Sequence, residues 1–203
     1  GKSVAPFGGR QGAFGTNPFS FGFPAEDHPD LLVDFATSAI AGGKVMVARA
    51  KHEPVPAGTL LDADGNPTTD PNALFAGGML LPFGGHKGYG MAVLSVLLSR
   101  TLVGAMDYAS DGGGNGVFIL AIDGGIFRDC GAVKTEADQV FDAIKAVTPV
   151  AGVDAVLIPG EPEAGAAERR LRDGIPVAED TWAEIVATAR SFGLTLERGS
   201  AKS

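Results

Sequence analysis

The stretch LPFGGHKGYG, residues 81–90, sets one histidine and one lysine among four glycines, directly ahead of a long apolar segment. Glycine tolerates positive φ and lets the backbone approach a ligand closely. Gly84, Gly85 and Gly88 therefore allow backbone N–H groups to point at an anion, and a helix behind them adds the positive end of its dipole. Lys87 supplies a point charge suited to a phosphate. The stretch predicts an anion site, and the competing interpretation is a lysine on a glycine-rich surface loop.

Composition limits the classes of function. A chain of 203 residues, 45% hydrophobic and 20% charged, is long enough for one sizeable core. A formal net charge of −8 argues against a nucleic-acid partner, which needs a basic face. Cys130 is the single cysteine, so neither an internal disulfide nor a multi-cysteine zinc site can form. The most apolar segment, residues 88–99, meets Arg100 after twelve residues, too short a run to span a bilayer. We expect a cytoplasmic protein without a nucleic-acid or membrane partner.

Apolar periodicity predicts strands that alternate with helices, and hence an α/β or mixed α+β class in which helices flank a mixed sheet. The apolar run 30–36 does not alternate and is expected to be buried on both faces. The segment 88–104 is apolar nearly all round and is expected to form a buried helix. Strands are predicted at 19–23, 30–36, 116–123 and 153–160, and helices at 36–51, 88–104, 135–147, 163–174 and 178–193.

Capping residues locate the starts of two of these helices. Thr37 or Ser38 is expected to cap the first helix, so that strand, Asp34 and helix start follow one another closely. Thr135 is expected to cap the helix over 135–147.

The usual nucleotide and hydrolase motifs are absent, which disfavours a standard Rossmann fold, a P-loop, a zinc protease or a serine hydrolase. Acidic residues instead follow two predicted strands. Asp34 lies at the carboxyl end of its strand, where open α/β sheets bind ligands and carboxylates accept ribose hydroxyls. The segment PGEPE, residues 159–163, places Glu161 after a glycine turn in the same way. Together with Lys87 these carboxylates would suit a dinucleotide, whereas His86 could equally contact a ligand or a nearby carbonyl.

The remaining polar segments suggest ordered turns. Residues 53–72 contain many prolines, glycines and aspartates and are expected to form an ordered excursion. Within it DADGN, residues 62–66, resembles the start of a calcium loop but has Ala73 where the twelfth-position glutamate belongs, so a turn without metal is expected. His28 and His52 lie in polar turns near prolines and are expected at the surface.

Five blocks in this order resemble one family. They are FGTNPFSFGFP (14–24), LLVDFATSAIAGGK (31–44), LDADGNPTTDP (61–71), LLPFGGHKGYGMAV (80–93) and IPGEPE (158–163). The resemblance is to the malate/L-lactate dehydrogenase family of type 2, which is unrelated to the Rossmann lactate and malate dehydrogenases. Sulfolactate and ureidoglycolate dehydrogenases and the piperideine-2-carboxylate reductases are relatives. The resemblance covers residues 3 to about 196 of the chain.

The resemblance implies a family-specific, non-Rossmann fold that binds NAD or NADP and forms homodimers. Residues 1–203 would be the NAD(P)-binding domain with the family's C-terminal helical region. Arg49, Arg169 and Arg170 are candidates for a 2′-phosphate contact. The implied cofactor-binding residues are Asp34, Phe35, Ala36, Lys87, Gly160, Glu161 and Pro162, with His86 and Asn17 shaping the same pocket.

The catalytic groups are expected outside this sequence. In the family, the acid/base histidine and the arginine that grips the substrate carboxylate belong to a segment ahead of the first matching block, so no catalytic residue is assigned here. The whole enzyme would move a hydride between nicotinamide and a 2-hydroxy acid, 2-oxo acid or cyclic imino acid. The alternative is a remnant that binds a dinucleotide or a partner protein without catalysis.

Overall fold

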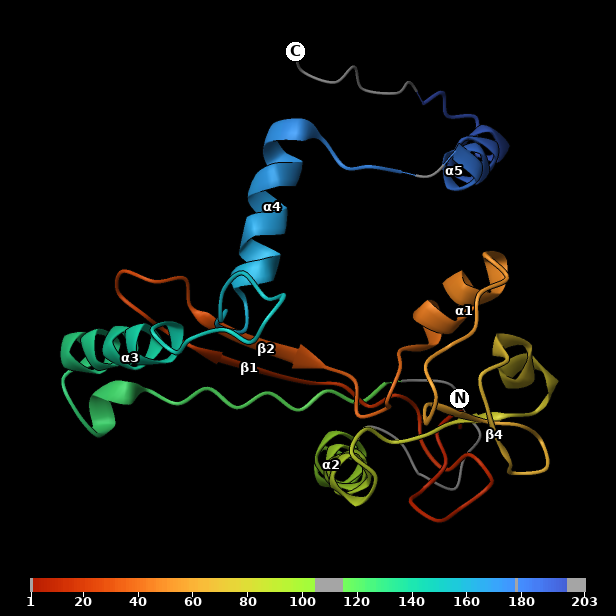
Figure 1. Ribbon diagram of the computed structural model, residues 1–203, viewed down its shortest axis with the longest axis horizontal. Helices are drawn as coiled ribbons and strands as arrows, with labels where there is room; N and C mark the ends of the chain where they lie inside the picture. The colour runs from red at the N-terminus through yellow and green to blue at the C-terminus, as the bar shows by residue number, and fades with distance from the viewer. Residues whose placement is uncertain (1, 105–114, 178, 197–203) are drawn as a thin grey trace. The chain divides into compact units, whose positions relative to one another are not determined.

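The computed structural model describes residues 2–104, 115–177 and 179–196. The chain divides into two compact units, the first made of residues 1–22 and 33–126 and the second of residues 23–32 and 127–203. The described residues form helices and two small sheets, which confirms the mixed α/β class (Figure 1). Among the described residues, no helix combines the length and apolar character needed to cross a bilayer.

Strands β1 (Phe19–Phe23) and β2 (Leu31–Phe35) pair with each other in a two-stranded sheet, as the sequence predicts for both segments (Figure 1). The expectation that β2 is buried on both faces is wrong. Its residues alternate between half-buried and exposed, and Leu32 is 45% exposed. An alternating pattern is what a ribbon covered on one face produces.

The first unit is built around a three-stranded antiparallel sheet in the order β4-β3-β5, made of β3 (Leu60–Leu61), β4 (Pro67–Thr68) and β5 (Met79–Leu80). Its other elements are α1 (Gly42–Ala50), η1 (Pro71–Ala76), α2 (His86–Val96), the π-helical η2 (Leu97–Leu102) and η3 (Gly124–Ile126). Val4, Val45, Val55, Leu60 and Leu80 form its core.

Helix α1 begins later than the sequence predicts, because the two expected capping hydroxyls bond elsewhere. The buried Thr37 hydroxyl donates to the Thr16 carbonyl over 3.0 Å, and the Ser38 hydroxyl donates to the Ile40 carbonyl over 2.8 Å. Ala41 occupies the N-cap position without a side-chain bond. An irregular segment therefore separates the end of β2 from the helix.

The segment predicted as a buried helix over 88–104 is helical, but most of its residues are half-buried or exposed. Helix α2 begins at His86, and only Gly88 and Ala92 of it are buried. Leu97 and Leu102 in the following η2 turn are 49% and 66% exposed. Several apolar side chains of this helical segment are therefore not packed against the rest of the described chain, and they leave an apolar surface that another element could cover.

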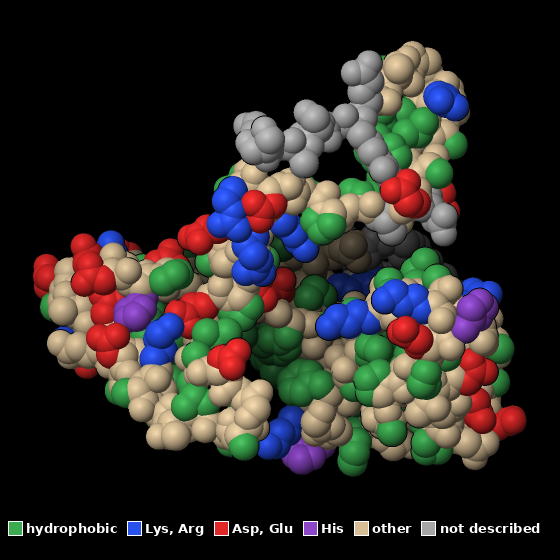
Figure 2. Space-filling view, turned by 45° about the horizontal axis from the view of Figure 1, so that its top comes forward, with side chains coloured by type: hydrophobic (Ala, Val, Ile, Leu, Met, Phe, Trp, Pro, Cys, Tyr) green, Lys and Arg blue, Asp and Glu red, His purple; other side chains and the backbone are tan. Residues whose placement is uncertain are grey.

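Two predicted strands, 116–123 and 153–160, are wrong: both segments are irregular in the structure. Ile119 and Leu120 are 84% and 70% exposed. An apolar run becomes a strand only when a neighbouring strand takes its backbone N–H and C=O groups. Hydrophobic side chains accordingly appear among charged ones on the face drawn in Figure 2.

The second unit contains helices α3 (Cys130–Lys145), α4 (Glu161–Asp173) and α5 (Glu179–Ser191). The predictions of α4 and α5 are confirmed. Helix α3 starts earlier than predicted, because the Asp129 carboxylate accepts the Ala132 N–H over 2.9 Å and so serves as its N-cap in place of Thr135. Ala25, Ala137, Phe141 and Ile158 form the core of the unit.

Asp138 of α3 holds the loop between β1 and β2. The residue is 8% exposed, and its carboxylate accepts the backbone N–H groups of Asp27 (2.9 Å), His28 (3.2 Å) and Glu26 (3.3 Å). These bonds, that from Asp27 foremost, lower the pKa of Asp138 against the opposing effect of its burial.

We expect Asp138→Asn to lower the thermal unfolding midpoint at pH 7, because an amide cannot accept three N–H groups as a carboxylate does. A lowered folded-state pKa stabilises the fold above the ordinary aspartate value of about 3.9, and that stabilisation is lost as pH falls through the folded-state pKa. The difference between variant and wild type should therefore shrink on acidification. Circular dichroism melts across this range measure it, with the exposed Asp154→Asn as control, and equal midpoints at pH 7 would contradict the assignment.

Candidate functional site

A tight turn precedes α2 and makes the predicted glycine loop. Gly84 and Gly85 adopt positive φ angles of 53° and 62°. The Gly88 N–H donates to the Phe83 carbonyl over 3.0 Å. A Cβ on Gly88 would lie 2.4 Å from the Phe83 carbonyl oxygen, so only glycine fits at this position.

The unpaired N–H groups of this turn are not the set that the sequence predicts, because the Gly88 N–H has an acceptor within the turn. Gly88 is turned to Phe83, the Lys87 N–H donates to the Gly84 carbonyl (3.3 Å) and the Tyr89 N–H donates to the Gly85 carbonyl (3.2 Å). In the described part of the chain, the N–H groups of Gly84, Gly85 and His86 have no acceptor. Three donors next to a helix start are available to an anionic ligand.

The two charged or ionisable side chains of the turn are exposed. Lys87 forms no ion pair with any described residue. The His86 ring meets the Phe7 ring edge-on, with centroids 6.1 Å apart. Both side chains are therefore accessible to a ligand at the start of α2.

The end of β2 lies directly against this turn. The Phe83 N–H donates to the Thr37 carbonyl over 3.0 Å, and the Phe83 ring packs edge-on against the Phe35 ring with centroids 5.5 Å apart. Phe35 stands between Asp34 and Ala36 in the predicted cofactor segment. Asp34 is exposed at this end of the strand. The structure thus brings two of the three predicted cofactor segments together within the first unit.

Asn17, the weaker candidate, belongs to the same neighbourhood. It has a positive φ of 37°, and its side-chain amide donates to the Ala92 carbonyl of α2 over 3.2 Å. This bond ties the GTNP segment to the helix that follows the glycine turn. Asn17 is therefore placed to hold the position of α2.

The third predicted segment, Gly160 to Pro162, belongs to the second unit. Gly160 has φ 105°, and a Cβ there would lie 3.0 Å from the Leu32 backbone nitrogen. The Leu32 N–H donates to the Pro159 carbonyl over 3.0 Å, which fixes the turn against the first residues of β2. Cofactor contact by Gly160, Glu161 and Pro162 stays a prediction.

Both carboxylate oxygens of Glu161 have partners inside the second unit. One pairs with the Lys145 ammonium, and the other accepts the Ile158 N–H over 2.7 Å. The Lys145 hydrogen bond foremost, and then the Ile158 N–H, lower the pKa of Glu161. These contacts stabilise the turn itself.

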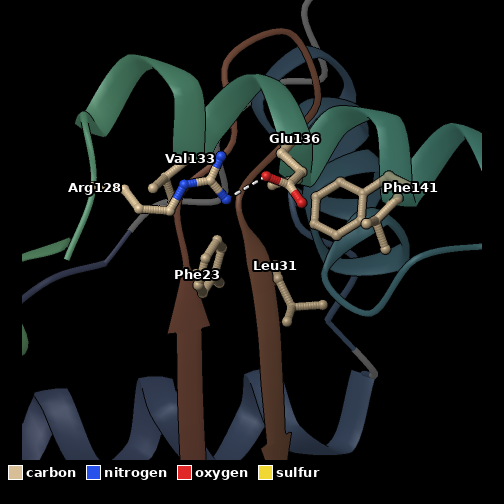
Figure 3. A pocket seen from close by; sticks show the side chains of 8 residues that line it. Phe23, Leu31, Arg128, Val133, Glu136 and Phe141 are labelled. Carbon is tan, nitrogen blue, oxygen red and sulfur yellow. Dashed lines mark hydrogen bonds and ion pairs between the residues drawn. The ribbon is translucent and has the colours of Figure 1, made fainter.

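A separate pocket of about 350 Å³ lies in the second unit and holds none of the predicted cofactor residues (Figure 3). Phe23, Leu31, Val133 and Phe141 give it apolar walls, and Arg128 forms an ion pair with Glu136 at its side.

The other sequence-predicted polar residues have structural partners. Asp62 accepts the N–H groups of Asp64 (3.0 Å) and Asn66 (2.9 Å), which confirms the predicted turn. His52 is exposed as expected. The surface expectation is wrong for His28: its side chain is only 22% exposed, and its Nε2 lies 2.8 Å from Asp142 Oδ1.

One candidate for a 2′-phosphate contact, Arg49, is held by α1 and η1. Its Nε donates to the Asn72 side-chain oxygen over 3.2 Å, and its guanidinium lies 4.4 Å from the Phe75 ring centroid. Arg169 and Arg170 lie on α4, and their contact with a 2′-phosphate stays a prediction.

Comparison with known proteins identifies the family. The malate/L-lactate dehydrogenase family matches residues 1–186. The chain is 39% identical to hydroxycarboxylate dehydrogenase B of Escherichia coli K12 and 37% identical to L-sulfolactate dehydrogenase of Methanothermobacter thermautotrophicus; each alignment covers 96% of this chain, and 56% and 57% of those proteins respectively. The structure of a putative malate/lactate dehydrogenase from E. coli superimposes with a TM-score of 0.81 at 35% identity, over 95% of this chain and 56% of that one.

The chain therefore belongs to the malate/L-lactate dehydrogenase family, as its five sequence blocks predict. It spans just over half the length of these relatives. The relatives are dehydrogenases by name, so the family is one of oxidoreductases.

The turn geometry makes a matched pair of substitutions informative. Gly88→Ala should destabilise the first unit by about 1–3 kcal/mol, because the added methyl group meets the Phe83 backbone. Gly90→Ala, two residues along the same helix, meets nothing within 4 Å and should stabilise by up to about 1 kcal/mol. Urea denaturation of both variants measures the difference, and equal effects would contradict the described turn.

Proposed function

We propose that this chain is the dinucleotide-binding part of an NAD(P)-dependent oxidoreductase that acts on a 2-hydroxy acid, a 2-oxo acid or a cyclic imino acid. The observation that supports this most strongly is the contact of Phe83 with Phe35 and Thr37, which joins the Asp34–Ala36 segment to the glycine turn. The end of β2, which carries Asp34, and the turn that leads to Lys87 therefore lie against each other. A dinucleotide offers hydroxyls to the first and phosphates to the second.

The residues of the first unit fit such a ligand. Gly85 and His86 offer unpaired N–H groups, Lys87 offers an accessible positive charge, and Gly88 lets the turn close tightly. The bound nicotinamide supplies the hydride chemistry. The residues of this chain would bind and orient the cofactor, and the residues that exchange a proton with the substrate and hold its carboxylate are proposed to lie elsewhere in the enzyme.

The substrate class is proposed from the relatives. Names such as hydroxycarboxylate dehydrogenase and sulfolactate dehydrogenase indicate small carboxylates that bear a hydroxyl next to the acid group. A pyrroline- and piperideine-carboxylate reductase of Pseudomonas aeruginosa, 37% identical, extends the class to cyclic imines.

We place the enzyme in the cytoplasm, as a homodimer. Exposed apolar side chains such as Ile119 and Leu120 offer surface for a second copy.

Calorimetric titration of NADH and of NADPH into the 203-residue chain tests the proposal. Lys87→Ala should weaken binding by about 1–3 kcal/mol, the range of a charge-assisted contact. Lys51→Ala, which removes an exposed charge just after α1, is the matched control and should leave binding unchanged. The better-bound cofactor identifies the physiological one.

Failure of the folded chain to bind either cofactor would contradict the proposal. Equal binding by the Lys87 and Lys51 variants would show that the glycine turn is not part of the cofactor site. Binding without turnover of any 2-hydroxy acid, even in the full-length enzyme, would favour the non-catalytic remnant.

A further inference from the structure

A cavity of about 450 Å³ lies beside the glycine turn in the first unit, and sequence reasoning did not find it. Its volume falls within the range of roughly 300–1,000 Å³ that is typical of small-ligand sites. Six residues from two chain segments, among others, line it: Phe7, Gly8, Gly9, Arg10, Gly84 and Gly85. The second of these segments belongs to the proposed cofactor site.

The two segments share a sequence pattern. FGGR (7–10) and FGGHK (83–87) each place an aromatic residue, two glycines and then a cationic side chain in order. The structure sets the two glycine pairs on one cavity. Walls of glycine expose backbone rather than side chains, so a ligand can approach the chain closely from both sides.

Arg10 is the cationic side chain of this cavity. It is exposed and forms no ion pair with a described residue. Its Cβ lies 2.9 Å from the place that a Cβ on Gly65 would occupy, so the start of the side chain packs on the backbone of the 62–66 turn. The Asp62 carboxylate in that turn accepts the N–H groups of Asp64 and Asn66. The Arg10 guanidinium is therefore available to form hydrogen bonds with a ligand.

Phe7 gives the cavity an apolar side. Its ring is 60% exposed and meets His86 edge-on, and a Cβ on Gly85 would lie 3.2 Å from it. The aromatic ring and the glycine turn therefore lie in direct contact. A group bound between them would be shielded from water on one side, which strengthens its attraction to a nearby guanidinium.

We propose that Arg10 is a further cofactor-contacting residue, which pairs with a phosphate group of the dinucleotide in this cavity. The inference rests on the proposed function, because it takes the ligand to be NADH or NADPH. A guanidinium forms bidentate hydrogen bonds with phosphate oxygens, so Arg10 would complement the single charge of Lys87 across the turn. The phosphate is either part of the pyrophosphate bridge or the 2′-phosphate of NADPH, and both have the same chemistry.

The test titrates NADH, NADPH and ADP-ribose into the wild-type chain and into Arg10→Met, with Lys51→Met as the matched loss of one exposed charge. Arg10→Met should weaken binding roughly tenfold or more, as loss of a charge-assisted contact does. Arg10→Lys keeps the charge without the planar fork and should fall between the two. Thermal unfolding midpoints equal to that of the wild type show that each variant is folded.

The pattern of losses identifies the phosphate. Equal weakening of all three ligands supports a pyrophosphate contact, and weakening of NADPH alone supports a 2′-phosphate contact. If Lys87→Ala weakens binding while Arg10→Met does not, the inference is overturned and the proposed function stands. If the wild-type chain binds none of the ligands, the proposed function fails and takes the inference with it.

Discussion

The close approach of Gly88 to Phe83 is the constraint on which the candidate site depends. The Gly88 N–H bonds to the Phe83 carbonyl, and the same approach leaves no room for a Cβ. Because the turn closes here, helix α2 can begin at His86 with Lys87 exposed next to it. Because the Phe83 backbone and ring also contact Thr37 and Phe35, the end of β2 is held at the same place. One glycine thereby connects the strand, the turn and the helix.

In the second unit, two carboxylates hold a loop and a turn in place by accepting backbone N–H groups. Asp138 gathers the backbone N–H groups of the loop before β2, and Glu161 bonds to Lys145 and to Ile158 within the turn at Gly160. Both groups have lowered pKa values because hydrogen-bond donors favour their charged forms. An acidic residue after a strand can therefore either accept a hydrogen bond from a ligand hydroxyl or stabilise its own turn. Glu161 bonds to groups of its own turn and of α3, whereas Asp34 is exposed and accessible to a ligand.

The sequence predicted the features that are decided locally. The strand at 19–23 and the turn at 62–66 depend on neighbours along the chain, and both are confirmed. The strands predicted at 116–123 and 153–160 failed because pairing depends on a distant partner, which no local pattern supplies. Arg10 was missed for the same reason: its proximity to Gly84 and Gly85 exists only in the folded chain. The repeated FGG pattern was the available signal.

The most direct test of the account is a map of the backbone amides that respond to the cofactor. In the nitrogen-15 spectrum of the labelled chain, NADH should shift the amide signals of Gly85 and His86, two of the unpaired donors of the turn, and that of Asp34 near the end of β2. The signals of α3 around Val133, in the pocket of the second unit, should stay in place. Shifts confined to that pocket, with Gly85 and His86 unmoved, would contradict the claim that the glycine turn binds the dinucleotide.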